Sequence, residues 1–156
     1  MFHIVFYRPE IPPNTGNAIR MVACTGAQLH LIEPLGFDLE EPKLRRAGLD
    51  YHDLARVTVH PDLESAWRLL TGRRVLAFTT SAQTLYTEVA FRVGDVLVFG
   101  PESVGLPSAV ANSPQVSERV HIPMVPGRRS LNLANSAAVA TFEAWRQHAF
   151  AVPAEP

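Results

Sequence analysis

The most constraining feature of the sequence is a series of short apolar runs separated by helical stretches. Residues 2–7 are almost continuously apolar, a pattern typical of a strand covered on both faces in a parallel sheet. Several of the helical stretches end at glycine, a common residue at helix C-termini. The alternation predicts an α/β fold, a mostly parallel sheet with helices on both faces and right-handed crossovers. The other expected strands are residues 29–32, 57–59, 75–78, 96–99 and 120–122, and the expected helices are 15–25, 41–47, 62–70 and about 131–148.

Length and charge narrow the class of protein further. With 156 residues the chain fits one domain, expected over residues 1–150 with a tail at 151–156. The 14 basic and 15 acidic residues give a net charge of -1, so any nucleic-acid site must be a local patch. The N-terminus lacks the basic start of a secretion signal, and no apolar run approaches the roughly 20 residues of a membrane span. We therefore expect a cytoplasmic protein that does not associate with membranes.

The last expected helix is apolar on nearly its whole circumference. Leu131, Ala134 and Ala138 lie on one side, while Leu133 and Ala137 make the other side apolar as well. Such a helix needs burial on two sides, and a domain of this size has one core. This favours a homodimer in which the second side meets another subunit. Burial of both sides by the sheet and loops of a monomer is the alternative.

Common cofactor motifs are absent from the sequence. There is no G-x-G-x-x-G after the first strand, no G-x-x-x-x-G-K-[ST], no H-E-x-x-H and no C-x-x-C. Dinucleotide, P-loop and zinc chemistries are therefore not expected, and neither is a metal ion.

Three polar segments each follow a predicted strand, at the carboxyl edge where open α/β sheets bind ligands. In the first, residues 9–20, Asn14 or Thr15 is expected to cap a helix and Arg20 to face an edge or cleft. The second, residues 100–107, is a stiff turn that carries Glu102. The third, residues 122–136, is a proline-rich loop that carries Ser130. In each case a purely structural role, as a cap, a turn or solvated surface, is the alternative.

These segments, in this order and spacing, resemble the motifs of the SPOUT class of S-adenosylmethionine-dependent RNA methyltransferases. The resemblance is closest to the TrmL (YibK) group, which methylates the ribose 2'-OH of the tRNA wobble nucleotide. It implies a homodimer and a C-terminal deep trefoil knot. The matching residues are 9–17 (PEIPPNTGN), 32–37 (IEPLGF), 44–52 (LRRAGLDYH), 99–102 (FGPE), 122–126 (IPMVP) and 143–147 (EAWRQ).

The resemblance also implies roles for individual residues. Arg20, Asn14 and Asn132 would face the reacting ribose as catalytic residues. The substrate would be the anticodon loop of tRNA, with C or U at position 34, and DNA is not expected to bind. The cofactor S-adenosylmethionine would leave as S-adenosylhomocysteine, and no metal is required. The residues implied to bind the cofactor are Phe78, Gly100, Glu102, Ile122 and Ser130.

Two positions depart from the family pattern. Phe142 stands where a tyrosine is expected, and Gly127-Arg128 replaces a polar or acidic pair. Both changes bear on which tRNA is accepted. Two other functions remain open: a methyltransferase of the same class acting on another tRNA or rRNA nucleotide, and a catalytically silent RNA- or nucleotide-binding module.

Overall fold

A single parallel sheet forms the centre of the computed structural model, which describes residues 1–38 and 56–152. All strand pairs are parallel, as predicted, and the order is β3-β2-β1-β6-β4-β7-β5. The expected helix at residues 41–47 lies outside the described residues. The strands are β1 (His3–Tyr7), β2 (Gln28–Ile32), β3 (Val57–His60), β4 (Val75–Phe78), β5 (Thr84–Leu85), β6 (Val96–Phe99) and β7 (Glu118–His121).

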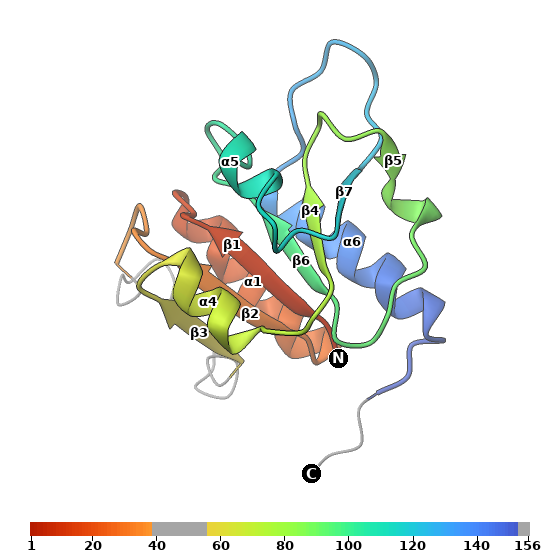
Figure 1. The fold of residues 1–156 in the computed structure, drawn as a ribbon, viewed down its shortest axis with the longest axis horizontal. Helices are drawn as coiled ribbons and strands as arrows, with labels where there is room; N and C mark the ends of the chain where they lie inside the picture. Colours follow the sequence, from red (N-terminus) through yellow and green to blue (C-terminus); the bar gives the residue numbers. More distant parts are fainter. Residues whose placement is uncertain (39–55, 153–156) are drawn as a thin grey trace.

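Helices cover both faces of the sheet (Figure 1). On one face, α1 (Pro12–Thr25) and α6 (Leu133–Gln147) pack with Ile4 and Phe6 of β1. On the other face, α4 (Leu63–Leu69) and the short α5 (Ser108–Ala111) pack with Val5. Successive side chains of a strand point to opposite faces, so a strand buried on both faces must be apolar throughout. The prediction of an α/β fold with helices on both faces is confirmed.

Two helices begin at residues other than those expected. α1 begins at Pro12, with Ile11 as an N-cap that makes no side-chain hydrogen bond, so the prediction that Asn14 or Thr15 caps it is wrong. The reason is that Pro12 and Pro13 suit the first turn of a helix, where backbone N–H groups have no intrahelical acceptor. α6 begins at Leu133, two residues later than expected, and is capped by Asn132.

α6 is only partly covered within one chain. Its buried side includes Leu133, Ala137 and Ala144, packed against the core. Val139 and Phe142 remain 38% and 45% exposed. Among the described residues, Val139 and Phe142 therefore leave a second side of this helix accessible.

The strand order reverses around β1. From β1 the chain builds outward to β2 and β3 on one side, while β6, β4, β7 and β5 lie on the other. In open α/β sheets such a switch point leaves a crevice at the carboxyl ends of the strands. The segments that follow β1, β6, β4 and β7 gather there, which places the three polar segments of the sequence at one edge.

A chain of three buried histidines links β1, β2 and β3. His3 Nδ1 lies 3.0 Å from His30 Nε2, and His30 Nδ1 lies 3.0 Å from His60 Nε2. Burial, with the nearby Arg73 charge adding to it, lowers the pKa of His3 to about 4. Burial and the flanking histidines lower the pKa of His30 to about 3, and burial also lowers that of His60. Each neutral imidazole has one N–H donor and one acceptor nitrogen, so an uncharged chain satisfies both contacts.

Candidate functional site

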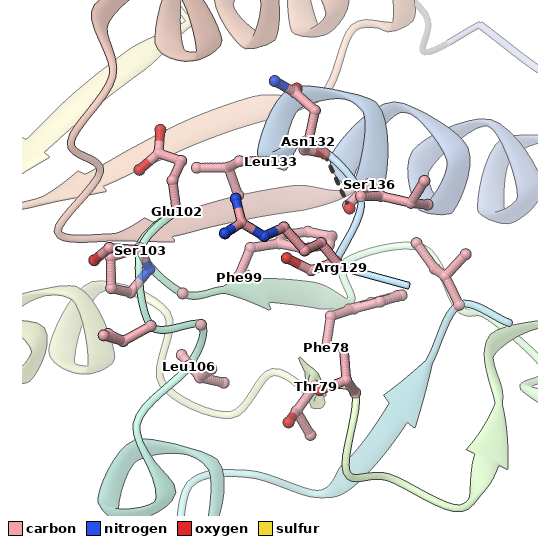
Figure 2. Close-up of a pocket in the computed structure, with 18 of the residues that line it drawn as sticks. Phe78, Thr79, Phe99, Glu102, Ser103, Leu106, Arg129, Asn132, Leu133 and Ser136 are labelled. Atoms are coloured by element: carbon pink, nitrogen blue, oxygen red, sulfur yellow. Dashed lines mark hydrogen bonds between the residues drawn. The ribbon is translucent and has the colours of Figure 1, made fainter. Parts of the chain in front are cut away.

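A cavity of about 600 Å³ opens at the carboxyl ends of the central strands (Figure 2). This volume lies within the range of small-molecule sites in proteins. Four stretches of chain that are distant in sequence contribute to its wall. The lining residues are 11, 14, 78–80, 99–106, 122, 124, 128–133 and 136.

Seven of the eight site residues expected from the sequence line this one cavity: Asn14, Phe78, Gly100, Glu102, Ile122, Ser130 and Asn132. The eighth, Arg20, does not line it. Arg20 lies on the exposed side of α1, six residues after Asn14. Six residues of α-helix rotate a side chain by about 120° from the first and advance it about 9 Å along the axis. The structure therefore places Arg20 outside the cavity wall, on another side of the helix that presents Asn14.

A hydrogen-bonded chain of three side chains crosses the cavity wall. Asn14, only 4% exposed, donates from Nδ2 to Glu102 Oε1 at 2.8 Å. Asn132 Nδ2 donates to Asn14 Oδ1 at 2.7 Å, and Asn132 Oδ1 accepts from Asn135 N at 3.2 Å. Because a carboxylate can only accept, it sets the orientation of the Asn14 amide, which in turn sets that of Asn132. These contacts join the start of α1, the loop after β6 and the start of α6.

The loop after β6 is anchored by the same carboxylate. Glu102 Oε2 accepts from Glu10 N at 2.8 Å, and its Oε1 accepts from Ile11 N at 3.2 Å as well as from Asn14. Hydrogen bonds to an ionised acceptor are stronger than neutral ones. A Cβ atom at Gly100 would overlap the backbone of Gly105 and Leu106, so the fold-back of this loop requires glycine at that position.

Aromatic rings form the apolar side of the cavity. Phe78 and Phe99 stack with ring centroids 4.6 Å apart and planes 22° apart, and Phe99 meets Phe6 edge to face. Both cavity-lining rings are less than a tenth exposed. Such packing restrains the rings, so the apolar wall is rigid.

Exposed arginines supply positive charge at the mouth of the cavity. Arg128 and Arg129 line it from the segment that precedes α6, and Figure 2 shows the Arg129 side chain extending into it. Thr79 and Thr80, which follow β4, also line the cavity but were not expected from the sequence. Applying the carboxyl-edge rule to β4 would have indicated them.

Within residues 1–38 and 56–152, no group of three or more His, Cys, Asp or Glu side chains is placed to hold a metal ion. No helix in these ranges has the length and apolar character needed to cross a bilayer.

Comparison with known proteins decides the family. The model of the SpoU rRNA Methylase family matches residues 1–142. The chain belongs to the SpoU methylase family. This confirms the expected SPOUT-class relationship.

Relatives of this SpoU methylase are similar over nearly their whole length. A tRNA (cytidine(34)-2'-O)-methyltransferase of Methylovorus glucosotrophus is 55% identical over 97% of this chain and 98% of its own. The Escherichia coli protein of the same name is 47% identical over 94% of each chain.

Solved structures agree with the fold. A structure described as giving insights into 2-OH methylation of C/U34 on tRNA has a TM-score of 0.85 and 46% identity, covering 96% of this chain and 91% of its own. The SpoU methyltransferase AviRb of Streptomyces viridochromogenes, in complex with AdoMet, has a TM-score of 0.83 and 25% identity, covering 94% of this chain and 60% of its own.

Proposed function

We propose that this SpoU methylase transfers a methyl group from S-adenosylmethionine to the ribose 2'-OH of nucleotide 34, C or U, in the anticodon loop of tRNA. The observation that carries the proposal is the Glu102–Asn14–Asn132 chain of hydrogen bonds in the wall of a cavity of ligand size. Relatives named for this reaction, at about half identity over nearly the whole chain, support the choice of substrate.

The cavity fits S-adenosylmethionine by its chemistry. The cofactor carries an adenosine and a short amino-acid chain but no phosphate, so it needs an apolar slot and polar backbone groups instead of a phosphate-binding loop. Phe78 and Ile122 supply apolar surface, while the Gly100 turn, Glu102 and Ser130 supply polar groups. When bound, the cofactor supplies a methyl group already activated on a sulfonium.

With an activated donor, the protein's task is to align the ribose oxygen and to stabilise the charge that develops on it. Asn14 and Asn132 hold fixed amide orientations at the cavity wall and are proposed to face the ribose. Arg20 is proposed to hold a substrate phosphate or the developing alkoxide. A guanidinium is permanently charged and is a poor general base, so the hydroxyl proton leaves through a substrate phosphate or water.

RNA recognition is proposed to rely on local charge and on an unpaired nucleotide. Single-stranded loops allow a nucleotide to be splayed into a site while arginines contact phosphates. Arg128 and Arg129 at the cavity mouth are suited to such contacts, whereas the net charge of -1 offers no general attraction to RNA.

We also propose a cytoplasmic homodimer with a C-terminal trefoil knot. The exposed Val139 and Phe142 on α6 give the helix a second apolar side for a partner subunit. In this arrangement the partner surface adjoins α1, which packs against α6 and carries Arg20. The knot is proposed from the family resemblance, with the segment between β7 and α6 threading the chain.

Incubation of the purified protein with methyl-labelled S-adenosylmethionine and total tRNA tests the function. After nuclease digestion, the label is expected in a 2'-O-methylated cytidine or uridine at position 34. A label on a base would contradict the reaction type, and a 2'-O-methyl group elsewhere in tRNA, or in rRNA only, would contradict the substrate. Calorimetry with S-adenosylhomocysteine separates an enzyme from a silent RNA-binding module, which need not bind it.

A further inference from the structure

Two carboxylates connect the loops after β1 and β6 in opposite directions. The backbone N–H of Glu10 donates to Glu102 Oε2, as described above. The side chain of Glu10 returns the contact: its Oε2 accepts from Ser103 N at 3.0 Å and its Oε1 from Ser103 Oγ at 2.8 Å. We call the two hydrogen bonds between Glu10 and Ser103 the clasp.

The backbone of Glu10 is held in place from a third loop. Gly36 N donates to Pro9 O at 2.9 Å, and a Cβ atom on Gly36 would lie 2.7 Å from Glu10 Cα. Glu10 therefore packs against the loop after β2 and makes hydrogen bonds to the loop after β6. Its carboxylate is directed at Ser103 by this backbone position, although both side chains are exposed.

The clasp acts on the part of the loop that faces the cavity. Ser103 lines the cavity beside Glu102, whereas Glu10 does not line it. The turn is closed by Gly105 N donating to Pro101 O at 2.9 Å, which joins the two ends of residues 101–105. Anchoring Ser103 therefore sets the position of Glu102 and of the Asn14 amide that Glu102 orients.

We propose that Glu10 is a positioning residue for methyl transfer, acting through Ser103 to hold the cofactor-binding loop in its productive place. The proposal rests on the proposed function, because it assigns the loop at residues 100–106 to the cofactor. Glu10 acts without touching either substrate. Its exposed position means that its loss affects the site much more than the stability of the fold.

Five variants separate geometry from charge. E10A removes both hydrogen bonds, and S103A removes the one from the hydroxyl. E10Q keeps both, because its Oε1 can accept from Ser103 N while its Nε2 donates to Ser103 Oγ, which accepts as well as donates. S103T keeps the hydroxyl. In the double variant E10A/S103A, the loss of the Ser103 hydroxyl removes no further hydrogen bond, because E10A has already removed its acceptor.

The measurements are S-adenosylhomocysteine affinity by calorimetry, kcat and KM for tRNA methylation, and hydrogen exchange of residues 100–106 in the protein without ligand. We expect E10A to weaken binding about tenfold, because it removes both hydrogen bonds that Ser103 donates to the carboxylate. S103A should weaken it about threefold, and E10Q and S103T should stay within about twofold of wild type. Exchange in this loop should be faster in E10A, with the Tm changed by no more than about 2 °C. The double variant should match E10A.

Several results would overturn the proposal. The first is an E10A variant with the affinity, turnover and hydrogen exchange of wild type. The second is an E10Q variant that loses as much affinity as E10A. The third is a drop in the Tm of E10A large enough to account for its lost activity. Wild-type protein that binds no S-adenosylhomocysteine overturns the proposed function, and with it the cofactor role of the clasp. Wild-type binding together with an unchanged E10A variant overturns the clasp alone.

Discussion

The neutral histidine chain across β1, β2 and β3 makes the stability of the fold depend on pH. His3 and His30 have pKa values of about 4 and about 3 in the folded protein, compared with an ordinary histidine pKa of 6.5. The unfolded chain therefore binds more protons than the folded protein below pH 6.5. Stability from these groups is fully present above pH 6.5 and is lost as the pH falls toward the folded pKa values.

The size of the loss follows from the shifts. A pH of 5.0 lies 1.5 units below the unfolded pKa of 6.5, and both histidines are still mostly neutral in the folded protein at that pH. Each neutral histidine lowers the unfolding free energy by about 1.4 kcal/mol per pH unit over this interval. This amounts to about 2 kcal/mol each and about 4 kcal/mol together, a large part of a typical unfolding free energy of about 5–15 kcal/mol. His3 and His30 are 8% and 1% exposed, so solvent does not screen them appreciably.

The assay is urea unfolding followed by circular dichroism at pH 7.5, 6.5, 5.5 and 5.0 and at one fixed protein concentration. The H3N variant is the control, because asparagine does not titrate and its amide can still donate to His30. We expect the drop in unfolding free energy from pH 7.5 to 5.0 to be smaller by about 2 kcal/mol in H3N, the contribution of His3 alone. The N-terminal amine, whose pKa is also lowered, is common to both proteins and cancels in the comparison. A free energy that is flat over this range in wild type, or an equal drop in H3N, would refute the reasoning.

Four other predictions address the site and the dimer. R20A should lower kcat about 100- to 1000-fold while S-adenosylhomocysteine affinity stays near wild type, because the proposed role of Arg20 is to stabilise charge in the transition state. Loss of cofactor binding in calorimetry would contradict this. N132A should lose both the cap of α6 and the contact with Asn14. N132S should restore the cap, which contributes about 1 kcal/mol of stability, without restoring turnover. Equal turnover of N132S and wild type would argue against the hydrogen-bonded chain. G100A should weaken cofactor binding, because its Cβ overlaps the backbone of the same loop, and calorimetry showing wild-type affinity would count against this placement. F142R should shift the protein toward a monomer in sedimentation at micromolar concentration. The control V93R, a similar change at a 65% exposed valine, should not. Unchanged sedimentation of F142R would contradict a dimer through α6.

Much of the site could be predicted from sequence because its parts are local. A continuously apolar run such as residues 96–99 predicts a buried parallel strand, and the turn that follows it must lie at the carboxyl edge. The resemblance to the SPOUT class then selected seven residues that line one cavity. The helix starts were harder to predict, since a proline pair at the first turn competes with a polar residue further on for the start of α1.

Local pattern was thus sufficient for the α/β class and for the edge of the sheet that carries the site, and the resemblance of the motifs to a known class was sufficient for the family. The tertiary structure decided which side chains meet there. Asn14 meets Glu102 and Asn132, 88 and 118 residues away, and Glu10 meets Ser103, whereas Arg20 does not line the cavity. Hydrogen bonds require atoms to lie within about 3 Å of one another. Contacts over such separations depend on strand order and on how the loops pack, and the periodicity of a single segment carries no information about either.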